Sequence, residues 1–482
     1  MRIYKFSEFF QFGHEQDLQA WIVKDILIDQ HPRLIGQETS IPGLFIGPLY
    51  YYLLVPFFAI LGMDPRASII PITLISLATI VSVYFVLTKL YGKKVGFIGA
   101  FIYSVSPAIV FLDRWAVPTQ PTLLWIIWFY YVVMMFSKGE LKVTPILLVL
   151  VALIWHIHIA FVPLLLLVPI AILLSKKSFI KVLVSIHRKY LIISLATCFM
   201  LLAPFMAFEL RHNFQQVRGV LNINQSRAEQ ARELREGYFK VEVITEYMNR
   251  VIWSPFLFQA NPKNPMIAKI PVLLFVFMGL TIWLYKKKRL SKQELVIIFS
   301  WLVIVFVGQM INKRIISDYY FNNLTIISLT IFSLVAYHLL LNKETAKWVL
   351  LGGIIFLVFG IGKVITKKVT LREFDDREAV VEFIAQDASD RGYPCQAINY
   401  IGDIPVRYGY RYLFWWKGGR QITPGNDVVV YSIVQPYTIS ESEIAFKSGE
   451  IGVILPADPQ VPDESVCNNP ERQLLPLNGF VN

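Results

Sequence analysis

Two acidic side chains near the start of the chain are the first candidates for chemistry. Glu15 and Asp17 occur in the run FGHEQD, directly before a segment, LQAWIVKDIL, whose apolar residues fall on one face of a helix. A carboxylate held at such a place can act as a general base that takes the proton of an acceptor hydroxyl. The alternative is that both acids only stabilise the first helical turn through the helix dipole, and their spacing alone favours this role.

A second run, PFMAFELRHNF, carries the pair Arg211 and His212. Together these side chains could bind a phosphate, because the planar guanidinium offers parallel donors to the phosphate oxygens. The alternative is an ordinary charged collar at the end of a membrane helix, where arginine and aromatic residues are common. The run by itself does not decide between the two.

Three shorter runs complete the candidates. They are Asp113-Arg114-Trp115, the pair His156 and His158, and Arg314 with Asp318. Two residues apart, the histidines point in different directions on a helix or a strand, so they are not a metal-binding pair. The three cysteines of the chain cannot form a four-cysteine zinc site either, so we expect no zinc.

The composition shows what kind of elements must position these residues. Of the 482 residues, 55% are apolar, which excludes a water-soluble architecture. The 46 Lys and Arg exceed the 34 Asp and Glu, giving a net charge of +12. Such a surplus can indicate nucleic-acid binding, but beside long apolar runs it indicates the cytoplasmic loops of a membrane protein. We therefore expect membrane lipids as partners and no nucleic acid.

Eight apolar stretches are clear candidates to cross a bilayer, which takes about 20 residues each. They lie near 68–90, 95–112, 119–136, 190–208, 269–286, 294–312, 320–341 and 347–365. Residues 143–175 are longer than one span needs, and counting them as two spans gives ten. Residues 143–175 must form a hairpin, because the basic loops on their two sides, 138–142 and 176–189, should both be cytoplasmic. The predicted architecture is a polytopic α-helical membrane protein.

Loop charge also gives the direction of each span. The lysine-rich loops at 89–94, 286–292 and 343–347 are likewise expected in the cytoplasm, which puts the C-terminus outside. The His156 to His158 turn then faces outside. All the candidate residues meet on that outer face, provided that residues 1–43 are external too.

Three further segments are less regular. Residues 44–61 are apolar but contain Pro48 and Pro56, so hydropathy does not show whether they cross or lie in the interface. Residues 209–268 form a long polar insertion, expected outside, with a surface helix over 226–250. The three predicted regions are 1–43, an external loop, 44–368, the transmembrane part, and 369–482, a soluble external domain.

The C-terminal region differs from the rest in charge and pattern. Residues 371–482 carry sixteen Asp and Glu against nine Lys and Arg, so the cytoplasmic charge bias is absent. A helical run, REAVVEFIAQDAS, precedes strand-like runs QAINYI, DVVVYSIV and IGVILP, which predicts a small α/β domain. Cys395 and Cys467 both lie there and could pair in an oxidising compartment, although sequence separation does not show whether they meet.

Four motifs resemble a known family when taken in order. FGHEQDLQAWIVKDIL, IGPLYYYLLVPFFAILG, FLDRWAVPTQPTLLW and PFMAFELRHNF are similar to motifs of the GT-C superfamily of membrane glycosyltransferases, of the protein O-mannosyltransferase and aminoarabinose transferase type. The resemblance covers residues 8 to about 365. It implies about ten spans, an interfacial helix at 44–61 that does not cross, and an external C-terminal domain. It also implies one more span before the acidic loop, so we expect the functional form to extend upstream of Met1.

The resemblance further implies an activity. Such enzymes transfer one sugar, with inversion, from a polyprenyl-phosphate donor to a lipid, glycan or protein acceptor at the outer face of the plasma membrane. The site residues carried over are Glu15 as the base with Asp17 as the fallback, and Arg211, His212, Arg314, Arg114 and His158 for the donor phosphate.

This chain departs from the family in three places. Glu15 with Gln16 stands where Asp-Glu is usual, and Gln120 where a second acid is usual. Phe45-Ile46 replaces an acid that binds metal in some members, so no metal ligand is predicted and a divalent cation is left open.

Two rival functions come from other classes. One is a transporter or lipid flippase, for which inverted repeats and matched broken helices would be expected, and the sequence shows neither. The other is an inactive relative that binds a lipid-linked sugar without transferring it. Neither the sugar nor the acceptor can be deduced from the residues.

The predicted topology can be tested in intact cells. Cysteines introduced by Ser40→Cys and Ser440→Cys should both react with an impermeant thiol reagent added from outside, because both regions are expected to be external. Protection of position 40 alone would mean that residues 44–61 cross the membrane.

Overall fold

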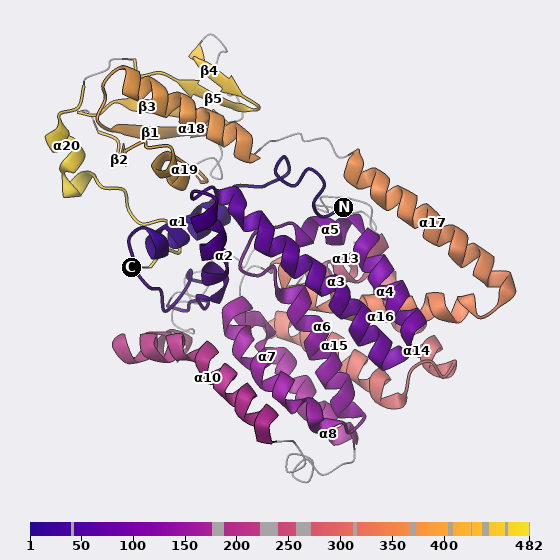
Figure 1. Ribbon diagram of the computed structural model, residues 1–482. Helices are drawn as coiled ribbons and strands as arrows, with labels where there is room; N and C mark the ends of the chain where they lie inside the picture. Colours follow the sequence, from indigo (N-terminus) through magenta and orange to yellow (C-terminus); the bar gives the residue numbers. More distant parts are fainter. Residues whose placement is uncertain are drawn as a thin grey trace.

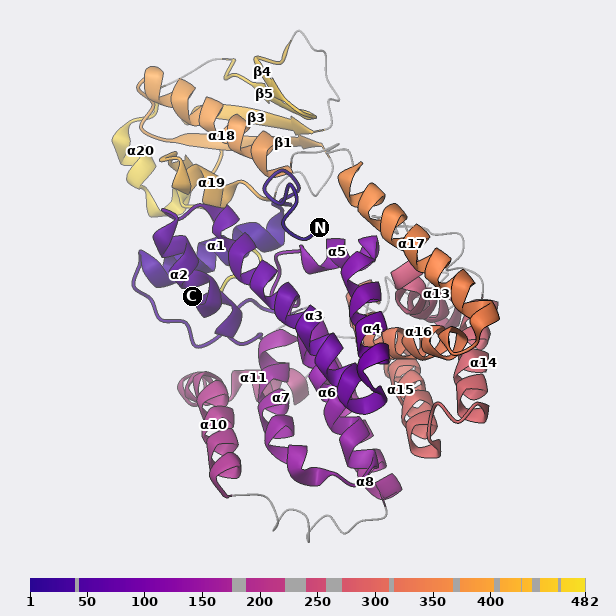
Figure 2. The same cartoon turned by 45° about the vertical axis from the view of Figure 1, so that its right-hand side comes forward.

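The fold is a helical bundle with a small mixed sheet set on one end (Figures 1 and 2). The computed structural model describes residues 1–39, 43–175, 188–221, 240–256, 271–311, 316–366, 373–402, 408–425, 427–435, 443–457 and 461–481. Arg314 and the labelling positions Ser40 and Ser440 fall outside what it describes, and of Asp318 it describes the backbone but not the side chain. The predicted polytopic helical class with a C-terminal α/β domain is confirmed.

An apolar helix occupies each of the ten predicted span positions. The helices are α3 (Ile69–Tyr91), α4 (Lys93–Val105) with α5 (Pro107–Asp113), α6 (Thr122–Ser137), α7 (Thr144–Ile157), η3 (Ile159–Leu166) with α8 (Leu167–Ser175), α10 (Arg188–Arg211), α14 (Val272–Lys286), α15 (Lys292–Ile311), η7 (Asp318–Leu324) with α16 (Thr325–Leu340), and α17 (Lys343–Ile365). Five are long and apolar enough to span a bilayer, and the bent α4 and α5 pair can be a sixth. The other four are shorter, so the count of ten stays a prediction.

The bend between α4 and α5 has a local cause. The two helices meet at 73° around Ser106 and Pro107. Proline cannot donate a backbone hydrogen bond into the preceding turn, but it suits the first position of a new helix. The Ser106 side chain caps that new helix by accepting from the backbone N–H of Ile109. The chain is thereby turned just before the candidate run at 113–115.

The predicted hairpin over 143–175 is present. Its arms, α7 and α8, both pack against α6, and its turn follows His156. The turn lies at the same end of the bundle as the N-terminal segment, because the Leu49 backbone N–H donates to His156 Nδ1 over 3.4 Å.

Residues 44–61 do not cross the bundle. They form α2 (Leu49–Ile60), a 12-residue helix of roughly 18 Å. Its first residue contacts the hairpin turn, and the chain just after it contacts the C-terminal domain, where the Gly62 carbonyl accepts from Trp416. Both ends of α2 therefore lie at one end of the molecule, as the interfacial alternative requires.

The insertion at 209–268 is partly buried in the bundle. Its described parts are α11 (Gln215–Leu221), α13 (Lys240–Trp253) and η5 (Ser254–Phe256). The second half of the predicted surface helix is α13, which buries Ile244, Met248 and Ile252 against α15 and α16. The predicted helix is therefore present over 240–250, and its apolar face completes the bundle core. The first half, 226–239, lies outside the described residues. Which side of a membrane the insertion faces stays a prediction.

The C-terminal domain has a five-stranded sheet covered by helices. The strand order is β2-β1-β3-β5-β4, with β1 parallel to β2 and β3, and with β5 antiparallel to β3 and β4. The elements are α18 (Glu373–Asp390), β1 (Gln396–Gly402), α19 (Arg411–Trp416), β2 (Gln421–Ile422), β3 (Val430–Gln435), β4 (Phe446–Ser448), β5 (Ile451–Ile454), α20 (Glu464–Asn468) and η10 (Pro470–Arg472). Cys395 and Cys467 form a disulfide with 5.8 Å between their Cα atoms, so the pairing considered above is confirmed.

The N-terminal segment and the C-terminal domain share one apolar core. Phe10 and Phe12 pack against Phe374 of α18, at centroid distances of 5.6 and 5.4 Å, and the second pair is edge to face. Beside them, Asp17 of α1 (His14–Leu27) is fully buried and accepts from the backbone N–H of Tyr412, the second residue of α19, over 2.8 Å. A carboxylate on the first turn of α19 complements that helix's dipole. The first residues of the chain are thus fixed by some of the last.

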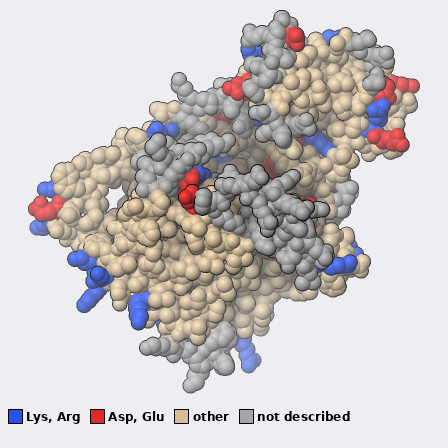
Figure 3. Space-filling view, turned by 180° about the vertical axis from the view of Figure 1, so that it is seen from behind, with Lys and Arg blue, Asp and Glu red and all other residues tan. Residues whose placement is uncertain are grey.

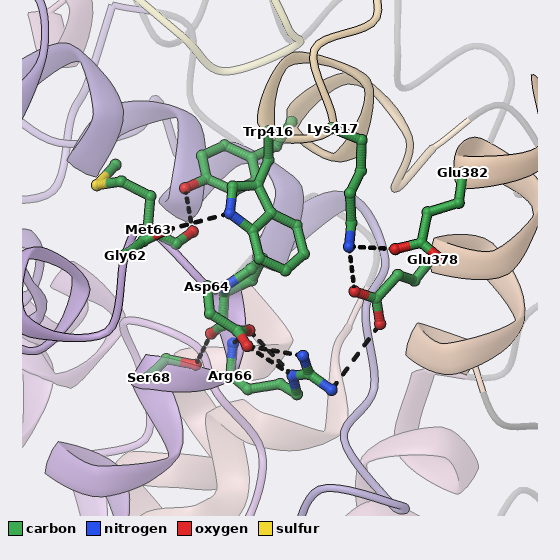
Figure 4. A network of polar contacts seen from close by, with 11 residues as sticks. Gly62, Met63, Asp64, Arg66, Ser68, Glu378, Glu382, Trp416 and Lys417 are labelled. Carbon is green, nitrogen blue, oxygen red and sulfur yellow. Dashed lines mark hydrogen bonds and ion pairs between the residues drawn. The ribbon is translucent and has the colours of Figure 1, made fainter. Parts of the chain in front are cut away.

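Charged and aromatic groups add a second contact between the two parts. The loop after α2 carries Arg66, whose guanidinium lies 2.7 Å from Asp64 and 3.8 Å from Glu378 of α18. Figure 4 shows Lys417 reaching both Glu378 and Glu382, next to the ring of Trp416 that donates to the Gly62 carbonyl.

Charge is divided between the two ends of the molecule. Seen from behind, Lys and Arg side chains mark the lower edge of the bundle, opposite the C-terminal domain (Figure 3). One cavity brings together Tyr91, Lys138, Lys286 and Arg289, so three of the predicted basic loops, those at 89–94, 138–142 and 286–292, share one end. Which side of a membrane that end faces stays a prediction.

Replacing Asp17 should reveal its role at the domain contact. Burial raises the pKa of Asp17 from 3.8 to about 6, so the folded protein keeps a proton that the unfolded chain has already released. This carboxyl therefore lowers the free energy of unfolding as the pH rises from about 4 to about 6, with no further change above that range. Asp17→Asn keeps an oxygen for the Tyr412 N–H but cannot ionise, so this part of the pH dependence should disappear.

Asp17→Ala is the matched comparison. It leaves a buried N–H without a partner and should lower the free energy of unfolding by about 1–3 kcal/mol. Unfolding midpoints of the solubilised protein at about pH 4 and about pH 7 measure both effects. An alanine variant as stable as the asparagine variant would contradict the cap.

Candidate active site

Glu15 lies on the first turn of α1, but its side chain does not cap this helix. The helix begins after Gly13, and the capping contact comes from Gln16, whose Oε1 accepts from the Gly13 N–H over 3.0 Å. Gln16 also donates to the Ala116 carbonyl at 2.8 Å, which ties α1 to the bundle. Neither acid caps α1 by a side-chain hydrogen bond. Asp17 accepts from the first turn of α19, and Glu15 accepts from Gln37 in the loop after α1.

The partner of Glu15 is an amide held in place by a buried tyrosine. Gln37 Nε2 donates to Glu15 Oε2 over 2.8 Å. The hydroxyl of Tyr51 donates to Gln37 Oε1 at 3.0 Å and accepts from the Gln37 backbone N–H at 3.2 Å. This arrangement holds a half-buried carboxylate by one oxygen.

More tyrosines surround the carboxylate. The buried hydroxyl of Tyr50 has no hydrogen-bond partner among the described residues, and burial together with the charge of Glu15 raises its pKa. The charge of Glu15 also acts on the hydroxyl of Tyr319 in η7. An unpartnered buried hydroxyl next to a carboxylate can donate to a bound substrate.

The hairpin turn closes the other side of this tyrosine cluster. His158 packs against Tyr319 and Tyr320, with ring centroids 5.4 Å apart in each case. Burial lowers the pKa of His158 to about 4, so it is neutral at pH 7 and binds as an imidazole rather than as a cation. Its Nδ1 accepts from the Ala160 N–H, which leaves Nε2 as the nitrogen that can carry a proton.

Two glycines let the chain approach these rings. The segment 36–47 folds back on itself, with the Gly36 N–H donating to the Ile46 carbonyl at 2.7 Å and the Gly47 N–H to the Trp155 carbonyl at 2.8 Å. A Cβ at Gly36 would lie 2.3 Å from the Tyr51 ring, and one at Gly47 would lie 2.1 Å from His156 Nδ1. Any side chain at either place would push the segment away from its neighbours.

Arg211 and His212 lie at the same end of the bundle as Glu15, but Phe208 and the 36–47 segment lie between the two clusters. The His212 ring stacks on Phe208 with 4.1 Å between centroids, and Phe208 packs edge to face with Phe45 of the 36–47 segment. Arg211 is exposed at the end of α10. The contacts therefore link the two candidate clusters through the 36–47 segment rather than by direct contact.

Arg114 and Asp113 are occupied by the start of the chain. The Arg114 guanidinium lies over the rings of Phe6 and Phe9, and it donates to the Tyr4 carbonyl. Asp113 is buried and forms an ion pair with Arg2 at 2.7 Å. These two residues thus hold the N-terminal segment on the bundle.

One buried cation escaped the sequence reasoning. Arg33 is the only Lys or Arg between Lys24 and Arg66, and this isolation could have singled it out. Its Nη1 lies 3.1 Å from Asp25, while its Nε and Nη2 are buried without a hydrogen-bond partner among the described residues. Gln37 was also missed, because nothing local marks one amide in a polar loop.

The comparisons with known proteins were made for the whole chain. No protein-family model matches it, and no curated protein matches its sequence. Two solved structures of ArnT, an aminoarabinose transferase of the GT-C superfamily, from Cupriavidus metallidurans are similar in fold, each at 12% identity. The undecaprenyl phosphate complex superposes with a TM-score of 0.56 over 92% of this chain and 94% of that one. The apo structure gives 0.55, over 92% and 93%. The expected architecture is confirmed in that this chain shares the fold of these two ArnT structures.

The described residues include no group of three or more His, Cys, Asp and Glu side chains that could hold a metal ion. The structure therefore offers no ligand set for the divalent cation that the sequence left open, within the part of the chain that it describes.

Gly47 offers a test of this geometry. Gly47→Ala should lower the free energy of unfolding by about 1–3 kcal/mol, because its Cβ would overlap the His156 ring. Gly308→Ala in α15 is the matched control, since its Cβ would meet no atom within 4 Å and should leave stability unchanged or slightly raised. Chemical unfolding of the two variants gives the comparison. Equal stability would show that the 36–47 segment does not pack on the hairpin turn.

Proposed function

We propose that this protein transfers a sugar from a polyprenyl-phosphate donor to an acceptor at the extracytoplasmic face of the plasma membrane. The observation that carries the proposal is the ArnT fold, shared over more than nine-tenths of both chains, with undecaprenyl phosphate bound in one of those structures. The tyrosine-lined carboxylate described above supplies the group that such a reaction needs.

In the proposed reaction an acceptor hydroxyl oxygen attacks the anomeric carbon of the sugar. The bond between that carbon and the phosphate oxygen breaks, and the polyprenyl phosphate leaves with the bonding electrons. Glu15 takes the proton of the hydroxyl as general base. Gln37 occupies Glu15 Oε2, so Oε1 is the oxygen for this transfer. Attack on the face opposite the phosphate inverts the anomeric centre.

Asp17 is the weaker candidate for the base. It is fully buried beneath α19 and its Oδ1 already accepts from the Tyr412 N–H. An acceptor hydroxyl could reach it only if the C-terminal domain separated from α1. Glu15, by contrast, is half-buried and lies among tyrosine hydroxyls rather than beneath another domain.

For the donor phosphate we propose Arg211 with His212, joined by His158 of the hairpin turn as a neutral N–H donor. A cation lowers the barrier by stabilising the charge that develops on the departing phosphate. Arg211 is exposed and its fork of donors fits phosphate oxygens. Arg114 is less suited, because its guanidinium is covered by Phe6 and Phe9. Arg314 keeps its predicted role, and it lies outside the described residues.

The disulfide supports an extracytoplasmic site. Disulfides such as Cys395 to Cys467 persist in oxidising compartments and are rare in the cytoplasm. The C-terminal domain that contains it shares a core with α1, which carries Glu15. The domain and the proposed site therefore belong on one side of the membrane, and the basic loops at the opposite end of the bundle fit the cytoplasm.

Catalysis can be tested with membranes that contain the protein and labelled polyprenyl-phosphate sugars. Glu15→Gln should abolish label transfer, by at least about 100-fold, because the amide keeps the shape of the carboxylate but cannot take the proton. Asp17→Asn is the matched control and should retain transfer, since it keeps the acceptor for Tyr412.

Binding of the donor is measured separately. Arg211→Lys should weaken donor binding severalfold, because a point charge replaces a two-donor fork, whereas Glu15→Gln should bind as the unaltered protein does. If Asp17→Asn abolishes transfer and Glu15→Gln does not, the base is Asp17. Donor binding without transfer by the unaltered protein, for every sugar and acceptor tried, would support the inactive-binder alternative instead.

A further inference from the structure

A cavity of about 790 Å³ opens at the end of the bundle opposite the candidate active site. It lies among the ends of α3, α6, α14, α15 and α16. The helix α3 connects the two regions: it starts beside the loop that contacts the C-terminal domain and ends at Tyr91 in the cavity wall. Its 23 residues separate them by roughly 35 Å. The cavity therefore does not belong to the site around Glu15.

The cavity wall has a surplus of positive charge. Four cationic side chains line it, Lys138, Lys286, Lys288 and Arg289, against one acid, Glu294. Two of these cations are already engaged. Lys138 pairs with Glu294 at 3.0 Å, and Arg289 donates to His338 at 3.2 Å.

The other two, Lys286 and Lys288, make no side-chain ion pair or hydrogen bond with any described residue. They lie on the last turn of α14 and in the loop that follows it. Two unpaired lysines at one cavity repel each other unless an anion lies between them. The cavity is thus built to take a negatively charged group.

Lys288 is held in a conformation that suits glycine better. Its φ is +57°, in the left-handed region. The turn ends α14 with the Lys288 N–H donating to the Tyr285 carbonyl and the Arg289 N–H to the Leu284 carbonyl, both at 2.9 Å. Helices that end with this pair of hydrogen bonds usually have glycine at the left-handed position. A lysine there gives up some stability and places a charge at the cavity.

The remaining lining residues identify the kind of anion. The cavity wall also contains leucines and tyrosines, namely Leu90, Tyr91, Tyr285, Leu290, Leu334 and Tyr337. Tyrosine rings are typical of the level where lipid headgroups meet acyl chains. A free phosphate would need the charges but not the apolar part of the wall, whereas a phospholipid uses both.

We propose that this cavity binds the phosphate-bearing headgroup of an anionic phospholipid of the cytoplasmic leaflet. Lys286 and Lys288 contact the phosphate, and the leucines and tyrosines contact the glycerol and the first acyl carbons. Basic pockets between transmembrane helices on the cytoplasmic side are known to take such headgroups. The bound lipid would join α14 and α15 to α3 and α6, which are distant in the chain.

The proposal is tested by binding, without any transferase assay. The full chain is purified in a neutral detergent and titrated with phosphatidylglycerol, with phosphatidylcholine, and with inorganic phosphate, while bound lipid is counted by native mass spectrometry and Tm is followed. Phosphatidylglycerol should bind and raise the Tm, and the other two should not.

Charge variants locate the binding site. Lys286→Gln combined with Lys288→Gly should weaken phosphatidylglycerol binding at least about fivefold, because both unpaired cations are lost. Lys343→Gln is the matched control: it removes one cation from the first residue of α17, outside the cavity, and should change the affinity less than about twofold. Lys288→Gly alone should keep or raise the Tm in detergent without lipid, since glycine accepts the left-handed φ, while still weakening lipid binding.

Several results would overturn the proposal. Equal binding of phosphatidylglycerol and phosphatidylcholine would exclude recognition of charge. Equal protection by inorganic phosphate would assign the cavity to a free anion instead of a lipid. Unchanged phosphatidylglycerol affinity in the double variant, or equal loss in Lys343→Gln, would show that the lysines act only as general loop charge. If the double variant does not fold, Lys286→Gln alone answers the same question.

Discussion

The apolar core shared by the two ends of the chain is the feature on which the rest of this structure depends. Phe10 and Phe12 contact each other within their own segment, and Phe374 of α18 packs against both rings. Asp17 then loses its water and gains the Tyr412 N–H. Since α1 is fixed by this contact on one side and by Gln16 bonded to Ala116 on the other, Glu15 has a defined place. Without the C-terminal domain, α1 would lose the first of these anchors.

The candidate site follows from that constraint because it is assembled from segments that are far apart in the chain. Glu15 comes from α1, Gln37 and Tyr51 from the loop and helix that follow, His158 from the hairpin turn and Tyr319 from η7. Each of these groups lies either in the first turn of a helix or on an irregular segment next to a helix end. Irregular backbone can adopt the close approaches seen at Gly36 and Gly47, while the apolar helices beneath it provide a rigid base.

The bilayer imposes a second division, between the two ends of the bundle. Helices must satisfy their backbone groups internally within the hydrocarbon, so polar chemistry is confined to their ends. At one end lie the carboxylate, the tyrosines and the disulfide-bonded domain. At the other lie the lysines, two of them lining a cavity without partners. The same physical rule thus produces the proposed transferase site and the proposed lipid site, and keeps them apart.

The sequence by itself determined the features that depend on local pattern. The length of the apolar stretches located the ten helices and the hairpin. Loop charge grouped basic loops at one end of the bundle. The periodic pattern of apolar residues located the helix α18 and the strands β1, β3 and β5. Motif order indicated the ArnT-like fold. Each of these signals is carried by neighbouring residues, because helix and strand periods repeat within a few positions.

The tertiary structure decided every feature that depends on a distant partner. The contact of Asp17 with Tyr412 spans 395 positions, and that of Asp113 with Arg2 spans 111. Nothing near Asp17 shows that it caps another helix, and nothing near Glu15 points to Gln37. The α13 helix carries a charged face that suggested a solvated surface, yet its other face is buried because α15 and α16 lie beside it. Burial sets the role of an ionisable group, and burial is a property of packing rather than of the residues next to it in the chain.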